Sequence, residues 1–431
     1  MTQSTTMSTT TTTTALALAV LLLPAGALVA SQEGADAALV AKARAVHERI
    51  FTVDSHVDIL GPTYATPALD PGKPTRLKCD LPKMKAGGLD GVFLAVFTSQ
   101  RPDFTPAGYR AARAEAIDRF DAIDRLAAMH PELCELARTP ADTERIEKSG
   151  KRVILVGVEN GYPMGDNVAT LKTFYDRGAR YVTLVHGSHN QLADSSGEAE
   201  PKYNGLSELG KRAVAEMNRL GIIVDTSHAS ARAFWDVIAV TRAPIMASHS
   251  GCAAVTKSDR NLDDEQLRAL AKNGGVIQIV ALGSYLKEDS PERAEAIGKL
   301  RRELGRGERG RRPGGGQPSQ PLTPDQQAER EKMFAVYRQR MEEIDRQFPG
   351  ATLKDFVDHI DHAVKVAGVD HVGIGTDFDG GGGIKGFNDH SEALNVTVEL
   401  LRRGYTEDQI GKIWGGNLLR VWREVDRVAG K

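Results

Sequence analysis

Eight short apolar runs, rich in valine and isoleucine, recur along the chain, and each is followed by a longer amphipathic stretch. A strand buried on both faces of a parallel sheet gives a continuous run of this kind. Eight strands that alternate with helices form a (β/α)8 barrel, which is the α/β fold that we predict. The expected strands are Phe51–Asp54, Val92–Phe97, Val153–Val158, Tyr181–Val185, Ile222–Thr226, Pro244–Ser248, Val276–Val280 and Val372–Thr376.

The segments between these runs carry the pattern of surface helices. Leu206–Leu220 and Leu353–Ala367 have apolar residues at three- and four-residue spacing, and a glycine follows each segment directly. Such periodicity with a terminal glycine indicates an amphipathic helix. We therefore expect residues 31–431 to form a single barrel domain.

One segment between the seventh and eighth expected strands departs from this pattern. Arg301–Pro324 is rich in glycine, proline and arginine and has almost no apolar residue, so it cannot bury a core. We expect a flexible insertion there, followed by a polar helix over Asp325–Arg346. The basic charge could also form an interaction patch, but a solvated insertion is the interpretation that we favour.

The N-terminal run Ala15–Ala30 is apolar throughout and ends in small residues. This is typical of an export signal, so residues 1–30 are expected to direct export to the periplasm or the medium. The run is shorter than the roughly 20 residues of a membrane-spanning helix, and no span is expected in the mature chain. An uncleaved N-terminal anchor is the alternative, since no Lys or Arg precedes the run.

Charge and cysteine content exclude several classes of protein. The 431 residues include 55 Lys+Arg and 57 Asp+Glu, which gives a net charge of -2. A nucleic-acid-binding protein needs a basic surface, so we expect no nucleic-acid partner. Cys79, Cys134 and Cys252 are scattered and form no CxxC pair, which excludes a disulfide scaffold and a thiolate zinc site.

Polar side chains stand at the ends of most of the expected strands. In a (β/α)8 barrel these ends lie on one rim, where the active site forms, so we expect the side chains to converge there. Histidines and carboxylates are the ligands that suit a catalytic cation. The candidates are His56, Asp58, Glu159, His186, His228, His249, Asp377 and Asp379.

The spacing of these residues suits a metal site. His56 and Asp58 are two apart on a strand and therefore point the same way, so they can share one ion. His228 and His249 end consecutive strands and can share another ion. Glu159 leaves an otherwise apolar strand, and a buried carboxylate there can bridge two metals.

Six motifs stand in this chain in one order: DSHVD, GVENG, YVTLVHGSHN, DTSHAS, ASHSG followed by SDRNLDDEQL, and VGIGTDFDGG. In this order they resemble the membrane (renal) dipeptidase family of zinc peptidases, within the amidohydrolase-like barrels. The insertion and the cysteine positions differ from the mammalian members, so the chain resembles a bacterial-type member. The resemblance covers nearly the whole chain beyond the N-terminal segment.

The resemblance implies two zinc ions. His56 and Asp58 would hold one ion, His228 and His249 would hold the other, and Glu159 would bridge them. A hydroxide between two zinc ions is a nucleophile that is available near neutral pH. The implied reaction is hydrolysis of the peptide bond of a dipeptide.

The resemblance also implies roles for three residues outside the metal set. His186 would contact the substrate carbonyl, Arg260 would bind the substrate carboxylate, and Asp377 would transfer the proton to the leaving amine. An imidazole donor, a planar guanidinium fork and a carboxyl base suit these tasks. His189 is interpreted as a loop residue and Asp379 as a structural one.

Two other functions are compatible with the same residues. A binuclear amidohydrolase that acts on acylated amino acids or another small amide would differ only in its pocket. A catalytically idle metal-binding barrel would keep the ligands without needing Asp377. We expect a small peptide as the substrate, and a homodimer is compatible with the sequence.

Overall fold

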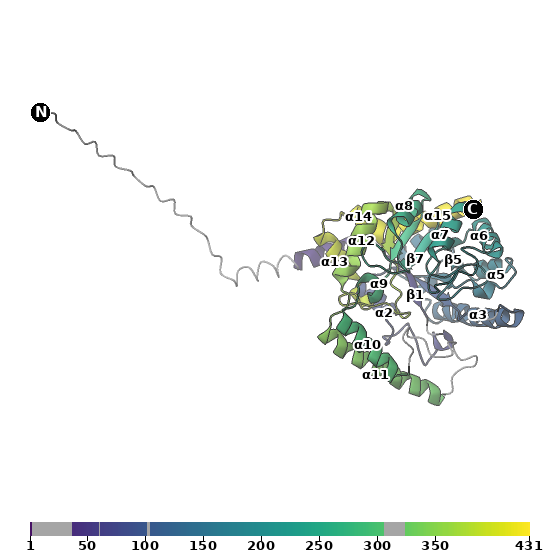
Figure 1. Cartoon of the computed structure of the whole chain (residues 1–431), viewed down its shortest axis with the longest axis horizontal. Coiled ribbons are helices and arrows are strands. Elements are labelled where there is room, and N and C mark those ends of the chain that lie inside the picture. The colour runs from purple at the N-terminus through teal and green to yellow at the C-terminus, as the bar shows by residue number, and fades with distance from the viewer. Residues whose placement is uncertain (2–36, 60, 101–103, 306–323) are drawn as a thin grey trace.

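The computed structural model describes residues 37–59, 61–100, 104–305 and 324–431, together with Met1. Helices surround a nearly closed barrel of parallel strands (Figure 1), so the predicted (β/α)8 fold is confirmed. Its strands follow in the order β1 (Val53–Asp58), β2 (Gly91–Phe97), β4 (Arg152–Glu159), β5 (Ala179–Thr183), β6 (Ile223–Asp225), β7 (Met246–Ser250), β8 (Val276–Ile279) and β9 (Val372–Ile374).

The barrel closes at a seam where β1 meets the residues that follow β9. A bridge joins Val57 to Phe378, and the N–H of Asp58 donates to the carbonyl of Phe378 over 2.9 Å. The N–H of Asp377 donates to the carbonyl of His56 over 3.0 Å. The seam therefore places His56 beside Asp377.

The limits of most strands differ from the prediction by one or more residues. β5 is Ala179–Thr183 rather than Tyr181–Val185, so His186 follows its strand by three residues rather than one. β7 begins at Met246 rather than Pro244, since proline has no N–H to donate to a ladder. It continues to Ser250, so His249 lies within the strand. β1 extends to Asp58 rather than ending at Asp54, because polar site residues replace the apolar pattern of a strand there.

Two further differences concern short strands. β3 (Cys134–Leu136) pairs with β4 outside the barrel path and was not expected, since three residues are too few for a readable pattern. β9 ends at Ile374, two residues before the expected Thr376. Asp377 therefore follows the strand by three residues rather than one.

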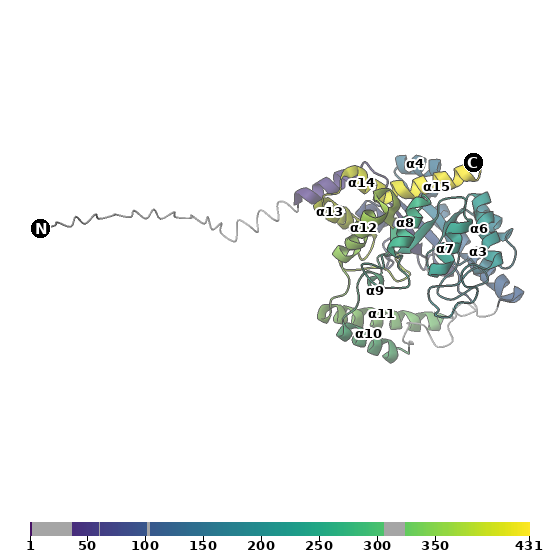
Figure 2. The ribbon, with the colours of Figure 1, turned by 45° about the horizontal axis from the view of Figure 1, so that its top comes forward.

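Most of the helices cover the outside of the barrel, and the others lie at its two ends (Figures 1 and 2). The helices are α2 (Leu81–Gly87), α3 (Pro106–Met129), α4 (Pro140–Lys148), α5 (Thr170–Asp176), α6 (Glu208–Leu220), α7 (Ala231–Val240), α8 (Asp264–Lys272), α9 (Gly283–Leu286), α10 (Pro291–Glu303), α11 (Pro324–Gln347), α12 (Leu353–Ala367), α13 (Ala393–Arg402), α14 (Glu407–Gly411) and α15 (Asn417–Val428). α12 matches its prediction. α6 begins two residues late because Ser207 caps it by accepting from the N–H of Gly210.

The two ends of the barrel are covered differently. Trp422 and Leu418 of α15 pack in one buried cluster with Val53 and Val276, which lie at the starts of their strands. α15 therefore closes the N-terminal end, while α10 and α11 lie at the opposite end of the molecule (Figures 1 and 2). The C-terminal strand ends, where the site residues lie, face the side of α10 and α11.

α10 and α11 form a hairpin in the place of the predicted insertion. The expected polar helix is confirmed as α11, but the expected start of the insertion at Arg301 is wrong, because α10 continues to Glu303. Residues 306–323 lie outside the described residues. Arg293 fixes the base of the hairpin through ion pairs with Asp289 and Asp345, both at 2.7 Å.

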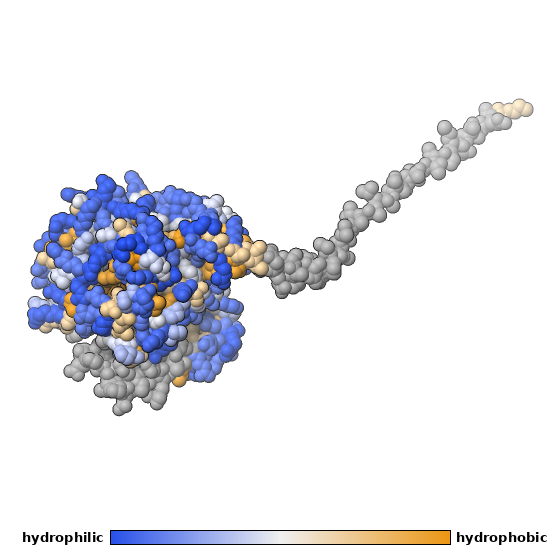
Figure 3. All heavy atoms as spheres, turned by 180° about the vertical axis from the view of Figure 1, so that it is seen from behind, coloured by the Kyte–Doolittle hydropathy of each residue, from blue (hydrophilic) through white to orange (hydrophobic). Residues whose placement is uncertain are grey.

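One face of the described surface shows how polar and apolar residues are distributed. The face in Figure 3 is mostly hydrophilic, with apolar residues in small patches. Among the helices of the described ranges, none is both long and apolar enough to cross a membrane. The predicted signal segment, residues 1–30, lies outside the described residues apart from Met1.

Candidate metal centre and active site

The candidate ligands come from the C-terminal ends of different strands. His56 and Asp58 lie in β1, Glu159 is the last residue of β4, and His249 lies in β7. His228 follows β6 by three residues and adopts a left-handed backbone with φ of 66°. That conformation is costly for a residue with a side chain, and it brings the His228 ring over Glu159.

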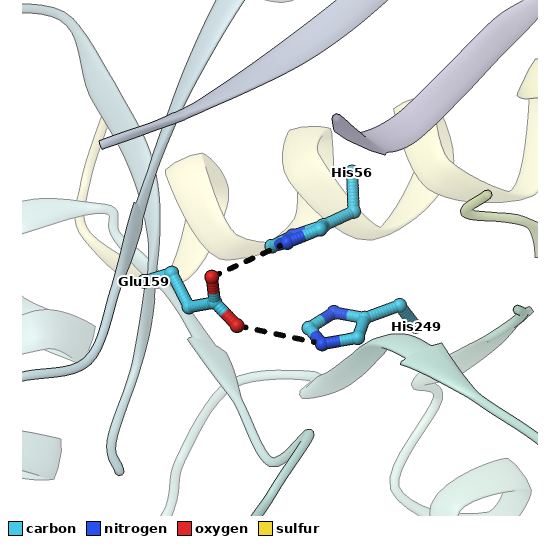
Figure 4. Close-up of side chains that lie close together, drawn as sticks. All are labelled: His56, Glu159 and His249. Carbon is cyan, nitrogen blue, oxygen red and sulfur yellow. Dashed lines mark ion pairs between the residues drawn. The ribbon is translucent and has the colours of Figure 1, made fainter. Parts of the chain in front are cut away.

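Glu159 lies at the centre of the cluster and is 3% exposed. Its Oε2 atom lies 3.5 Å from His56 Nε2, and its Oε1 atom lies 3.5 Å from His249 Nε2 (Figure 4). Oε1 also lies 3.1 Å from His228 Nε2 and 3.8 Å from His186 Nε2. Oε2 therefore faces His56, whereas Oε1 faces the other three imidazoles.

Two buried atoms indicate that a cation fits on the His56 side. His56 Nε2 and Asp58 Oδ1 are 4.0 Å apart, and both are buried without a hydrogen-bond partner. A buried polar atom without a partner is costly unless a ligand satisfies it. His56 Nε2 also lies 3.5 Å from Glu159 Oε2, and an imidazole with nearby carboxylates is a zinc-type donor set.

The other side of Glu159 holds a second donor set. His228 Nε2 and His249 Nε2 are 2.9 Å apart, close to the ~3.3 Å between two ligands of a tetrahedral zinc ion. Burial lowers the pKa values of both imidazoles well below the ordinary value, so both are neutral. Neutral imidazoles offer the lone pairs that a metal needs.

A buried chain of hydrogen bonds fixes the tautomer of His249. The hydroxyl of Ser248 donates to Asp225 Oδ2 over 2.6 Å, so its oxygen accepts from His249 Nδ1 over 2.8 Å. His249 Nε2 therefore carries the lone pair that faces Glu159. Such outer hydrogen bonds orient metal-binding histidines in general.

Tyr181 holds His56 in the same way. Its hydroxyl lies 2.8 Å from His56 Nδ1, which leaves Nε2 to face Glu159. The ring fits because residue 157 is glycine, where a Cβ atom would lie 1.9 Å from the Tyr181 ring. Tyr181, Ser248 and Asp225 were not among the predicted site residues. The Ser-His pair of ASHS could have indicated Ser248, and the first residue of DTSH could have indicated Asp225.

The electrostatics of the cluster favour added positive charge. Burial acts to lower the pKa of His56, but Glu159 and Asp58 outweigh it and raise the value to about 10. Burial and the charge of Glu159 raise the pKa of Asp58 well above its usual range. Either a proton or a bound cation can supply the positive charge that these carboxylates require.

Asp377 lies beside this cluster. Its backbone is left-handed with φ of 59°, and burial raises the pKa of its carboxyl to about 7. Oδ1 of Asp377 and Oδ2 of Asp58 lie 2.2 Å and 2.5 Å from the point where Gly380 would carry a Cβ atom. The two carboxylates therefore converge on the same small space.

Asp379 and His189 have other partners. The carboxylate of Asp379 accepts hydrogen bonds from the N–H groups of Lys78 and Cys79 and so anchors that loop. His189 Nδ1 accepts from the N–H of Ser195 over 2.9 Å. Neither residue belongs to the groups of potential ligands around Glu159.

Arg260 and His186 border the cluster. Arg260 Nη2 donates to the carbonyl of His249 over 3.0 Å, while its Nε atom is buried without a hydrogen-bond partner. The side chain of His186 is 34% exposed, and its ring lies 4.9 Å from that of Phe97 and 4.3 Å from that of His228. Both residues therefore lie at the border of the Glu159 cluster.

Comparison with known proteins decides the family. A sequence model of the membrane dipeptidase family (peptidase family M19) matches residues 40–431. The chain belongs to the membrane dipeptidase family. The resemblance inferred from the motifs is thus confirmed, and with it the class of metallo-dipeptidases, which hydrolyse peptide bonds.

Individual members agree with this assignment. The probable dipeptidase PvdM from Pseudomonas aeruginosa has a TM-score of 0.77 and 35% identity, over 91% of this chain and 99% of that chain. Dipeptidase tcpJ from Claviceps purpurea is 30% identical over 81% of this chain and 70% of its own length. A metallo peptidase from Rhodobacter sphaeroides, liganded with a phosphinate mimic of L-Ala-D-Ala, shares the fold with a TM-score of 0.67 and 22% identity, over 87% of this chain and 99% of its own.

The raised pKa of His56 predicts that metal binding by this dipeptidase releases a proton. With a pKa of about 10, the imidazole is protonated at neutral pH in the metal-free protein, and a cation must displace that proton. Apparent zinc affinity should therefore fall as the pH is lowered from 10, by up to about tenfold per pH unit for each displaced proton. Calorimetric titration in buffers of different ionisation enthalpy measures the protons released.

His56→Gln provides the control, because zinc-bound water also loses protons. At pH 8 the variant should release about one proton fewer than the parent. Equal proton release from both proteins would show that the metal displaces no proton from His56.

The space at Gly380 gives a second prediction. Gly380→Ala places a methyl group against Asp377 Oδ1 and Asp58 Oδ2, so one carboxylate must move, and turnover should fall by about 10²-fold. Gly381→Ala is the matched control, since its Cβ would lie 3.1 Å from Leu282 and 3.5 Å from Asp377 Oδ2. Steady-state kinetics and metal analysis of both variants test this, and equal activity of the two would contradict it.

Proposed function

We propose that this chain hydrolyses dipeptides with two zinc ions. His56 and Asp58 would hold one ion, His228 and His249 the other, and Glu159 would bridge them. The division of Glu159, with Oε2 toward His56 and Oε1 toward His228 and His249, is the observation that carries the proposal. Ions held there supply an activated water molecule and polarise the scissile carbonyl.

Asp377 is the proposed proton carrier. A carboxyl group with a pKa of about 7 can take a proton from water and return it to a leaving amine near neutral pH. The carboxylates of Asp377 and Asp58 both lie next to the point where Gly380 would carry a Cβ atom. Asp377 is therefore beside a proposed metal ligand, which supports this role.

His186 and Arg260 are the proposed substrate-binding residues. The imidazole of His186 is partly exposed and lies 3.8 Å from Glu159, so it can donate to the carbonyl oxygen as negative charge develops. The guanidinium of Arg260 is held on one side by the carbonyl of His249 and has an unpartnered Nε–H. Such a group suits the free carboxylate of a short peptide.

The experiment that tests this function compares substrates with and without a free carboxylate. The zinc-loaded protein should cleave dipeptides, lose activity on chelation, and cleave dipeptide amides poorly. Arg260→Ala should lose about 2–4 kcal/mol of transition-state binding on dipeptides, measured as kcat/KM. Arg268→Ala, at a side chain that is 60% exposed on α8, is the control and should behave as the parent does.

Other outcomes of the same assay would replace the proposal. Cleavage of acylated amino acids without cleavage of dipeptides would indicate an amidohydrolase for small amides. Stoichiometric zinc without any turnover would indicate an idle barrel. Equal treatment of dipeptides and their amides by parent and Arg260→Ala would remove the carboxylate role.

Asp377 should control the acidic limb of the pH profile. Burial raises its pKa, so the carboxyl is protonated and inactive as a base below about pH 7, and bound cations shift that limit to lower pH. Asp377→Asn should keep its zinc, lower turnover by about 10²–10⁴-fold and lose this limb. Asp379→Asn should instead lower thermal stability, and the reverse pattern would exchange the two roles.

The export of this protein and its assembly into a homodimer remain predictions. The N-terminal run Ala15–Ala30 supports export, and sequencing the N-terminus of the mature protein tests cleavage. A homodimer is tested by the molar mass in solution.

A further inference from the structure

A buried histidine–carboxylate pair lies behind the candidate metal centre. His390, in a 3-10 turn (His390–Glu392) before α13, and Asp54 of β1 are both 0% exposed. Their Nε2 and Oδ2 atoms are 2.8 Å apart. Neither residue contacts Glu159, so the roles already described do not account for this pair.

Asp54 connects the two chain segments that meet at the seam. Its Oδ1 atom accepts from the N–H of His56 over 3.1 Å and from the N–H of Thr376 over 2.9 Å. The hydroxyl of Thr376 donates to its Oδ2 atom. One carboxylate thus holds the backbone of a proposed ligand and that of the residue before Asp377.

An irregularity in β1 explains why this carboxylate is needed. The pairing of β1 with β2 shifts register between Asp54 and Val57, which is a β-bulge. Within the bulge, the N–H of His56 donates to the side chain of Asp54 instead of to β2. The direction of the His56 side chain therefore depends on where the Asp54 carboxylate lies.

His390 is itself held rigidly. Its N–H donates to the carbonyl of Lys78 over 3.0 Å, and its ring packs 5.0 Å from the ring of Phe378. Gly87 lies against its carbonyl, where a Cβ atom would be 1.9 Å from the oxygen. The imidazole can therefore fix Asp54 from outside the barrel.

We propose that His390 is a positioning residue which, through Asp54, sets the separation of His56 and Asp377. The inference rests on the proposed roles of those two residues. Without the His390 donor, the buried Asp54 carboxylate loses one of its four hydrogen bonds and can shift, and the bulge and the seam shift with it. His390 then acts on the reaction without touching metal or substrate.

The test replaces His390 by leucine, which keeps bulk, and by glutamine, whose amide N–H can reach Asp54. Cobalt(II) substitution provides a readout besides activity, because its visible absorption reports ligand geometry. His390→Leu should lower kcat by about 10–100-fold with KM little changed, and should alter the cobalt spectrum. His390→Gln should restore most of both properties.

His47→Leu controls for the loss of a buried histidine. His47 bonds to the hydroxyl of Thr397 over 2.6 Å, away from the metal centre, so this variant should lose stability but keep the parent's kcat and cobalt spectrum. If His390→Leu does not fold, Thr376→Val removes another donor to Asp54 with little change of shape and should alter kcat and spectrum in the same direction.

Three results would overturn the inference. These are a folded His390→Leu protein with the parent's kcat and spectrum, a His390→Gln protein as impaired as the leucine variant, or a Thr376→Val protein indistinguishable from the parent. Failure of the proposed function is a separate result, since the parent itself would then bind no cobalt or cleave no dipeptide.

Discussion

The burial of Glu159 is the constraint on which the C-terminal end of this barrel depends. An uncompensated carboxylate in such surroundings would cost several kcal/mol. Burial acts to raise the pKa of Glu159, yet His56, His186 and His228 outweigh it and hold the value well below its usual range. The negative charge is thus kept, and with it the demand for cations at this rim.

That demand explains the irregular backbone around the cluster. His228 and Asp377 both adopt left-handed conformations, each of which costs about 1–3 kcal/mol for a residue other than glycine. This backbone strain persists because hydrogen bonds hold the residues directly before His228 and Asp377.

Two buried aspartates provide those hydrogen bonds in the same way. Asp225 accepts from the N–H of Ser227 two residues on, from the N–H and hydroxyl of Ser248 on the next strand, and from the hydroxyl of Thr183. Asp54 repeats the pattern at the seam, with His390 as its additional donor. The backbone of the site is therefore held by two carboxylates that lie outside the proposed set of metal ligands.

The sequence by itself determined the barrel, its helices and the rim on which the polar residues gather. Apolar runs predict parallel strands because both faces of such a strand are buried, and a single rim follows from parallel order. The motifs also identified the family, although the limits of several strands, among them β1, β5, β7 and β9, were misplaced. At β1 polar site residues take the place of the apolar pattern, at β9 the strand ends two residues before the predicted run does, and at β7 the run began with a proline that cannot join the ladder.

Only the tertiary structure decided how those residues act together. The split of the Glu159 oxygens between two donor sets depends on strands that are far apart in sequence. The roles of Tyr181 and His390 could not be predicted from the sequence. A buried tyrosine or histidine cannot be distinguished from an ordinary core residue until its hydrogen-bond partner in another segment of the chain is known. Periodicity and composition report burial along one segment, whereas hydrogen bonds between segments depend on the closed barrel.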